Sequence, residues 1–484
     1  MRANSVLAKL AKTKNECSIW LVYTIAISII SAYHEPWFDE YHVWFMCEKM
    51  KLTWLWSAMT REGHFMLWHL LIYPFVKLGC SFWCLQFVGV CLASIAAFIL
   101  TFKAPFNLFT KVLILFSYPI LFQFFVIARC YALIPAILFV IAWLHKAQNK
   151  HKFLYCFFIG LLAHTHAYME GMVGGLFLLY CWDHIYKPYK KNINIKSSIY
   201  GALITIGVVF MAFIQVSGSL KFAQENITNK TNSILEVIES ICLFRTTNYN
   251  FIIPGNWHQL FPDIIQYHPF IYIAYFSLWS IILFLLYFIL WKEKENRKYM
   301  YLYLIAIAWQ IYMAIAVYGF GLQRIFLPFL ILIFILWISW KKEVRYHITL
   351  IIACLFLMTA GYRVILKDIK ESFSNDISLY NYIENTINHK YPLYISDCTI
   401  KYRDIYDNYE KIIEQSPDPI FPSETKLLDV MNKFNNCEQY YLFTKNPLNT
   451  KYRLINTKLI SDTLNCKIYR ISRNKNTNCS HQKE

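Results

Sequence analysis

Residues 34 to 45 read His-Glu-Pro-Trp-Phe-Asp-Glu-Tyr-His-Val-Trp-Phe and follow directly on the first long apolar stretch of the chain. A Glu-Pro step breaks the chain there, because proline cannot sit in a helix interior without losing a backbone hydrogen bond. Beyond this charged and aromatic segment the chain returns to apolar sequence many times. Ionisable side chains at the edge of the first apolar stretch predict a functional site at a membrane boundary.

The composition of the whole chain supports a membrane. Hydrophobic residues make up 57% of the 484 residues and charged residues only 16%, and the mean hydropathy is +0.35, which is more apolar than soluble domains usually are. A spanning helix needs roughly 20 mainly apolar residues. About eleven runs near that length begin around Trp20, Phe82, Val112, Ala132, Phe153, Gly171, Ile199, Ile271, Tyr301, Ile325 and Ile348. The sequence therefore predicts an all-α polytopic membrane protein with about eleven transmembrane helices.

The formal net charge of +17 does not point to nucleic acid, because the basic residues form short clusters between the apolar runs. Such clusters usually lie on the cytoplasmic side of a membrane. They occupy residues 2–14, 146–152, 187–196, 292–298 and 341–345. We therefore expect a cytoplasmic N-terminus, with the segment around residues 34–64 on the opposite face.

Two domains are expected. Residues 1–363 form the transmembrane module, with external loops at 34–64 and 217–268, and residues 364–484 form a small soluble α/β domain outside the cytoplasm. Residues 65–79 are too short for a comfortable span and suit an interfacial or re-entrant helix, although a span remains the alternative. In the tail we expect helices at Ile405–Ile413 and Glu424–Phe434 and strands at Leu393–Ser396, Gln439–Thr444 and Cys466–Ile471.

Asp39 and Glu40 are the candidate catalytic residues. One carboxylate can act as general base on an acceptor hydroxyl while the other orients the acceptor or tunes the first. Neighbouring residues of a helix point about 100° apart, so the two should not share one role. The side chains expected to line the pocket around them are Trp37, Tyr41 and His42. The alternative is an ordinary interfacial belt of aromatic residues.

Cations and a histidine turn follow further along the chain. Arg129 and Arg324 each stand alone beside long apolar runs, where a guanidinium can bind a phosphate bidentately or merely anchor a helix end. His64 is a third candidate for the phosphate. Pocket-lining roles are expected for Tyr131, His164, His166 and Glu170. A metal is not indicated, because two histidines at i and i+2 suit metal binding only on an extended segment and no Asp-x-Asp pair is present.

Four motifs together carry a resemblance over roughly residues 15 to 185. They are Trp-Phe-Asp-Glu after the first span, Glu-Gly-His-x-x-Leu-Trp at residue 62, Ala-Arg-Cys-Tyr-Ala-Leu at residue 128, and the histidine turn two spans later. The pattern resembles the GT-C superfamily of lipid-sugar-dependent glycosyltransferases, especially the bacterial members akin to protein O-mannosyltransferases and the aminoarabinose transferase. The chain departs from that family at His64-Phe65-Met66, where His-Pro-Pro is usual, and at Pro135, near which no acidic residue stands.

The resemblance implies transfer of a hexose or pentose from an undecaprenyl-phosphate-type donor to a glycan, lipid or protein acceptor. The reaction would take place on the non-cytoplasmic face of a bacterial inner membrane, with Asp39 at the position of the family's catalytic acid. The residues independently suit this chemistry, since cations are available for a lipid phosphate and a carboxylate for the acceptor. A polysaccharide polymerase or ligase is the alternative and would not depend on Asp39 and Glu40. A transporter would be expected to place charges inside its spans.

Overall fold

The computed structural model describes residues 2–34, 36, 38–62, 65–191, 194–217, 233–235, 237, 269–317, 323–341 and 344–370, and in the tail residues 393–395, 412–413, 439–444, 455–463 and 466–473. The chain divides into two compact units, Met1–Ser372 and Phe373–Glu484. The expected external loop at 217–268 lies almost entirely outside the described residues.

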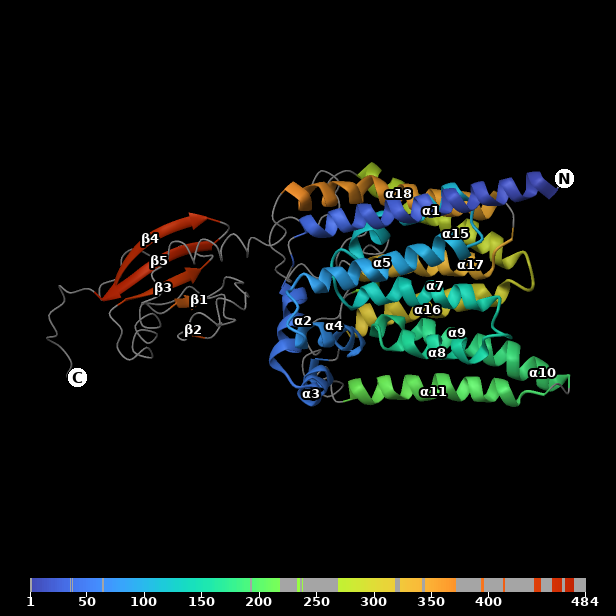
Figure 1. Ribbon diagram of the computed structural model, residues 1–484, viewed down its shortest axis with the longest axis horizontal. Coiled ribbons are helices and arrows are strands. Elements are labelled where there is room, and N and C mark those ends of the chain that lie inside the picture. Colours follow the sequence, from blue (N-terminus) through green and yellow to red (C-terminus); the bar gives the residue numbers. More distant parts are fainter. Residues whose placement is uncertain are drawn as a thin grey trace. The chain divides into compact units, whose positions relative to one another are not determined.

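Apolar helices running side by side build the first unit (Figure 1). Its longer helices are α1 (Arg2–Tyr33), α5 (Cys84–Lys103), α7 (Leu133–His145), α8 (Lys152–Ala163), α9 (Glu170–Cys181), α11 (Lys196–Ser217), α15 (Pro269–Trp291), α16 (Arg297–Ala316), α17 (Leu327–Ile338) and α18 (Val344–Lys370). Among the described residues, four helical segments are long and apolar enough to cross a bilayer: Thr13–Tyr33, Cys84–Lys103, Lys196–Ser217 and Arg297–Ala316. The unit is a helical membrane protein, and the count of eleven spans stays a prediction.

The apolar run that begins at Val112, predicted to form one span, is broken in the structure. Helix α6 (Leu108–Leu115) is followed by a π-helical turn, η1 (Pro119–Gln123), and then by irregular backbone up to the short 3-10 helix η2 (Cys130–Ala132). The side chains of Phe122, Phe124 and Phe125 are fully buried. The run is apolar because protein surrounds it, and irregular backbone at membrane depth is tolerated only in such surroundings.

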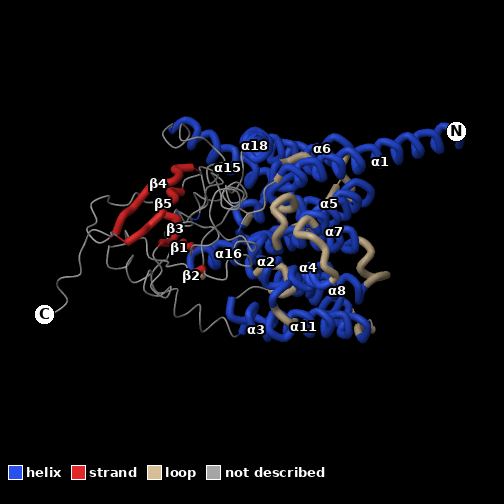
Figure 2. Tube along the Cα trace, turned by 60° about the vertical axis from the view of Figure 1, so that its left-hand side comes forward, coloured by secondary structure: helices blue, strands red, loops and turns tan. Residues whose placement is uncertain are grey.

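Three short helices, α2 (Phe38–Lys49), α3 (Leu52–Glu62) and α4 (Leu67–Lys77), gather at the end of this unit away from the N-terminus (Figures 1 and 2). Helix α4 has 11 residues, about half of what a bilayer requires, and it packs against α2. Its length suits the interfacial or re-entrant helix expected for residues 65–79.

Ion pairs link the basic clusters of the opposite end. Asp183, in the π-helical turn η4 (Trp182–Tyr186) that leads into α10 (Lys187–Lys190), pairs with Lys187 at 2.9 Å and also with Lys298. Glu293 pairs with Lys341 and, at 3.6 Å, with Arg345. Three of the predicted cytoplasmic clusters therefore share one end of the helices, as a common membrane face requires.

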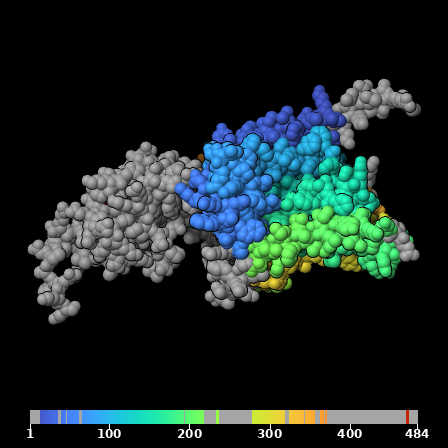
Figure 3. Space-filling view, turned by 60° about the horizontal axis from the view of Figure 1, so that its bottom comes forward, coloured from blue at the N-terminus to red at the C-terminus, as the bar shows by residue number. Residues whose placement is uncertain are grey.

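Burial separates the core of this unit from its lipid-facing surface. Every side chain of α17 from Leu327 to Ile338 is buried, as expected for a helix that is apolar on all sides. Helix α11 instead exposes an apolar stripe and forms one edge of the unit (Figure 3), with Leu203, Ile206, Phe210 and Phe213 all at least half exposed. These positions recur at helical spacing, so they present one face to lipid.

The second unit contains a five-stranded sheet in the order β2-β1-β3-β5-β4. Its strands are β1 (Leu393–Ile395), β2 (Ile412–Ile413), β3 (Gln439–Thr444), β4 (Ile455–Thr463) and β5 (Cys466–Arg473). Strand β1 is parallel to β2 and β3, and β5 is antiparallel to β3 and β4. Strands β1, β3 and β5 occupy the three places where strands are expected. The helix expected at Ile405–Ile413 is wrong at its end, because Ile412 and Ile413 pair with β1, and the helix expected at Glu424–Phe434 lies outside the described residues.

Candidate active site

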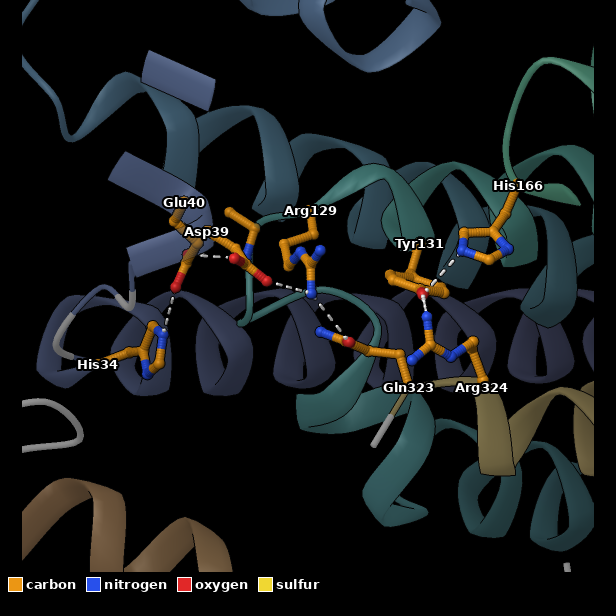
Figure 4. Close-up of polar contacts among 9 residues, drawn as sticks. His34, Asp39, Glu40, Arg129, Tyr131, His166, Gln323 and Arg324 are labelled. Atoms are coloured by element: carbon orange, nitrogen blue, oxygen red, sulfur yellow. Dashed lines mark hydrogen bonds and ion pairs between the residues drawn. The ribbon is translucent and has the colours of Figure 1, made fainter. Parts of the chain in front are cut away.

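The acidic pair lies in the first turn of α2, directly after the break that ends α1. Carboxylates are favourable there, since the first backbone N–H groups of a helix carry partial positive charge. The side chains of Asp39 and Glu40 leave the helix in different directions (Figure 4). They meet different partners, so they differ in what they can do.

Asp39 forms an ion pair with Arg129, with 2.7 Å between Asp39 Oδ2 and Arg129 Nη1. Arg129 comes from the irregular segment between η1 and η2. The Asp39 side chain is 28% exposed and that of Arg129 18%. Both groups can therefore be reached from outside, which a reacting carboxylate requires.

Glu40, expected beside Asp39 as a second catalytic carboxylate, is fully buried. Its Oε1 accepts a hydrogen bond from the Ala128 N–H at 2.9 Å, and its Oε2 lies 3.1 Å from His34 Nε2. Both oxygens are engaged inside the protein, so the structure favours a role for Glu40 in positioning the neighbouring segment over contact with an acceptor.

A second arginine, Arg324, lies near Arg129 although the two are far apart in the sequence. Arg324, in the 3-10 turn η7 (Arg324–Phe326) before α17, donates to the Tyr131 hydroxyl at 3.4 Å. The Arg129 guanidinium lies 5.6 Å from the centre of the same tyrosine ring and donates to Gln323 Oε1 at 3.5 Å. Two guanidiniums thus converge around Tyr131 (Figure 4), an arrangement suited to an anion such as a phosphate.

His166 completes this group of side chains. Its Nε2 lies 2.9 Å from the Tyr131 hydroxyl, and the two rings stack with centroids 4.7 Å apart. The backbone at His166 is extended, with φ −164° and ψ 140°, and leads into the 3-10 turn η3 (Ala167–Met169). His166 therefore orients Tyr131, which in turn contacts both arginines.

The structure separates the other candidates from this group. His164, two residues before His166, turns the other way and lies 2.9 Å from the Val208 carbonyl oxygen of α11. Glu170 begins α9 and is half-buried, outside the chain of contacts described above. His42 is half-buried in α2, and Tyr41 lies in the same helix with its side chain outside the described part. Trp37 and His64 are outside the described residues.

Three residues that contact the site were not assigned from the sequence. Gln323 accepts a hydrogen bond from Arg129, His34 lies against Glu40, and Asp368 lies against His34. His34 carried a weak signal, as the first residue after an apolar run. Asp368 offered little, because it lies far along the chain in the last turns of α18. Within the described residues, no group of three His, Cys, Asp or Glu side chains is arranged to hold a metal ion.

Comparison with known proteins finds a structure with a similar fold. No protein-family model matches the chain, and no curated protein does. Among solved structures, the chain is similar to ArnT from Cupriavidus metallidurans, crystallised bound to undecaprenyl phosphate, with a TM-score of 0.54. The match covers 95% of this chain and 97% of ArnT at 8% sequence identity. At that identity the likeness shows a shared fold over nearly the whole length of both chains.

Proposed function

We propose that this chain is a membrane glycosyltransferase that moves a sugar from a polyprenyl-phosphate donor to an acceptor at the membrane boundary. The observation that carries the proposal is the accessible Asp39–Arg129 pair beside Arg324, in a helical unit that shares the fold of ArnT. ArnT holds undecaprenyl phosphate in its crystal structure, and a polyprenyl phosphate is the leaving group of the donor proposed here.

The chemistry needs one base and a compensating positive charge. The acceptor hydroxyl attacks the anomeric carbon of the sugar, its proton passes to Asp39, and the bond from that carbon to the donor phosphate breaks. Polyprenyl phosphate leaves with the electron pair and gains one negative charge. Arg129 and Arg324 offset that charge. Cations held at the position where charge develops in the transition state lower the barrier most.

The resting ion pair suggests how the site opens. A donor phosphate competes with the Asp39 carboxylate for Arg129, because a phosphate and a carboxylate are both oxyanions that accept hydrogen bonds from a guanidinium. Binding of the donor then frees Asp39 to accept a hydrogen bond from the acceptor. The donor would thereby switch on the base that uses it.

The proposed site faces away from the cytoplasm, on the outer side of a bacterial inner membrane. Support comes from the position of α2 at the end of the helices opposite the N-terminus (Figure 1). The paired basic clusters around Asp183 and Glu293 occupy the other end, where the positive-inside bias puts the cytoplasm. A glycan, lipid or protein acceptor would meet the donor there.

The test is transfer of radiolabelled sugar from a panel of undecaprenyl-phosphate hexoses and pentoses in membranes that carry the full-length chain. Asp39→Asn removes the base, so transfer should fall by roughly 100-fold or more, while binding of undecaprenyl phosphate persists. Asp183→Asn is the matched control, because Asp183 is also an ion-paired carboxylate but lies at the opposite end. Equal transfer by wild type and Asp39→Asn would remove Asp39 from the reaction and favour the polymerase or ligase.

A further inference from the structure

A buried cluster of three ionisable side chains lies behind the candidate site. His34 Nε2 lies 3.1 Å from Glu40 Oε2, and His34 Nδ1 lies 3.0 Å from Asp368 Oδ2. The side chains of all three are fully inaccessible to solvent. The cluster joins the end of α1, the first turn of α2 and the last turns of α18.

Hydrogen-bonding rules set the proton count of His34. An ionised carboxylate only accepts, so a histidine between two of them must donate from both ring nitrogens and is then positively charged. Burial by itself would lower the pKa of His34, but the charges and hydrogen bonds of Asp368 and Glu40 outweigh it and raise the pKa to about 10. With both carboxyls ionised, His34 is a buried cation that bridges them.

Glu40 connects this cation to the segment that carries Arg129. Its second oxygen accepts from the Ala128 N–H, and Asp39 pairs with the next residue, Arg129. The first turn of α2 and residues 128–129 are thus joined twice, once by each acidic residue. One link is accessible and the other is buried.

The two links behave differently when a donor binds. In the proposed mechanism the phosphate draws Arg129 away from Asp39, so the accessible link opens. The buried link has no such competitor, because Glu40 and His34 are sealed from solvent. Of the two links, it is the one that then still holds Asp39 at a set separation from the arginine that binds the leaving phosphate.

We propose that His34 is a positioning residue for the transfer reaction: by bridging Glu40 and Asp368 it holds the first turn of α2 against residues 128–129 while the Asp39–Arg129 pair is open. The proposal rests on the proposed function for its catalytic consequence. Its structural part, that His34 secures the Glu40 contact with Ala128, stands without it.

The first readout does not depend on activity. Hydrogen exchange by mass spectrometry on the full-length chain in detergent reports the amide of Ala128, which Glu40 protects. His34→Gln should speed exchange of the peptide around residue 128 by about tenfold or more, because two buried carboxylates lose the cation between them. His145→Gln is the matched control, a buried histidine between Tyr155 and Tyr299, and should leave that peptide unchanged. Equal exchange in wild type and His34→Gln would overturn the proposal.

The second readout is turnover per correctly folded molecule, with undecaprenyl phosphate affinity measured beside it. His34→Gln should lower turnover at least about tenfold and change that affinity less than about twofold, because His34 touches neither arginine through the contacts above. Adding Asp368→Asn removes one of the buried negative charges and should restore part of both turnover and exchange protection. Turnover per folded molecule that stays at the wild-type level in His34→Gln, or that the added substitution fails to raise, would refute a positioning role.

The two readouts separate the two ideas. If wild-type protein transfers no sugar from any donor while His34→Gln still loosens the peptide around residue 128, the proposed function fails and the positioning contact stands. If transfer occurs and exchange does not change, the function stands and the positioning role is refuted.

Discussion

Replacing Arg129 by lysine separates the charge at the site from its geometry. The guanidinium reaches Asp39 at 2.7 Å and Gln323 at 3.5 Å, and it lies over the Tyr131 ring at 5.6 Å. A lysine ammonium keeps the positive charge but lacks the planar fork that makes several directed contacts at once. The substitution should therefore weaken phosphate binding without abolishing it.

The size of the effect follows from the contacts that lysine cannot reproduce. A hydrogen bond to a charged group is worth about 1.5–3 kcal/mol, and about 1.4 kcal/mol corresponds to a factor of ten in affinity. The Arg129 side chain is 18% exposed, so solvent screens part of this energy and the lower half of the range applies. We expect the affinity for undecaprenyl phosphate to fall about 10- to 40-fold.

The assay is a titration of undecaprenyl phosphate into full-length protein in nanodiscs, followed by intrinsic tryptophan fluorescence. Arg345→Lys is the control, because Arg345 pairs with Glu293 at 3.6 Å at the other end of the helices and should bind the lipid as wild type does. If Arg129→Lys and Arg345→Lys bind undecaprenyl phosphate equally well, Arg129 does not hold the phosphate and the reasoning fails.

Gly171→Ala should destabilise the protein by about 1–3 kcal/mol through overpacking, because a new Cβ would overlap the Trp309 side chain of α16. A Cβ at Gly174 would meet nothing within 4 Å, so Gly174→Ala should be tolerated. Thermal unfolding in detergent compares the two variants. The raised pKa of His34 means that its contribution to stability is fully present below the ordinary value of 6.5 and is lost as pH rises through about 10. Unfolding temperatures measured from pH 6.5 to 10 should therefore fall more steeply for wild type than for His34→Gln, and parallel curves would contradict this. Tyr131→Phe removes the hydroxyl between the second arginine and a buried histidine and should reduce transfer about 3- to 10-fold, which single-turnover kinetics would detect.

Much of the membrane architecture can be predicted from the amino-acid sequence. Hydrophobicity sums along a segment, so apolar runs and the basic clusters between them predict helices and a common cytoplasmic end without any contact being known. The strands at Leu393–Ile395, Gln439–Thr444 and Cys466–Arg473 follow in the same way from local composition. The run after Val112 is the counterexample, since an apolar segment looks the same whether lipid or protein surrounds it.

Within the site, the order of residues reveals which residue types are available: an acidic pair after the first span, two lone arginines and a histidine turn. The three-dimensional packing is needed to see which carboxylate is accessible and which is buried, and that Tyr131 contacts His166 and not His164. Neighbouring residues on a helix or turn point in different directions, and the packing of distant elements chooses between those directions. The role of Asp368 likewise depends on packing, because its contact with His34 spans 334 positions of the chain and forms only once α1 and α18 lie together.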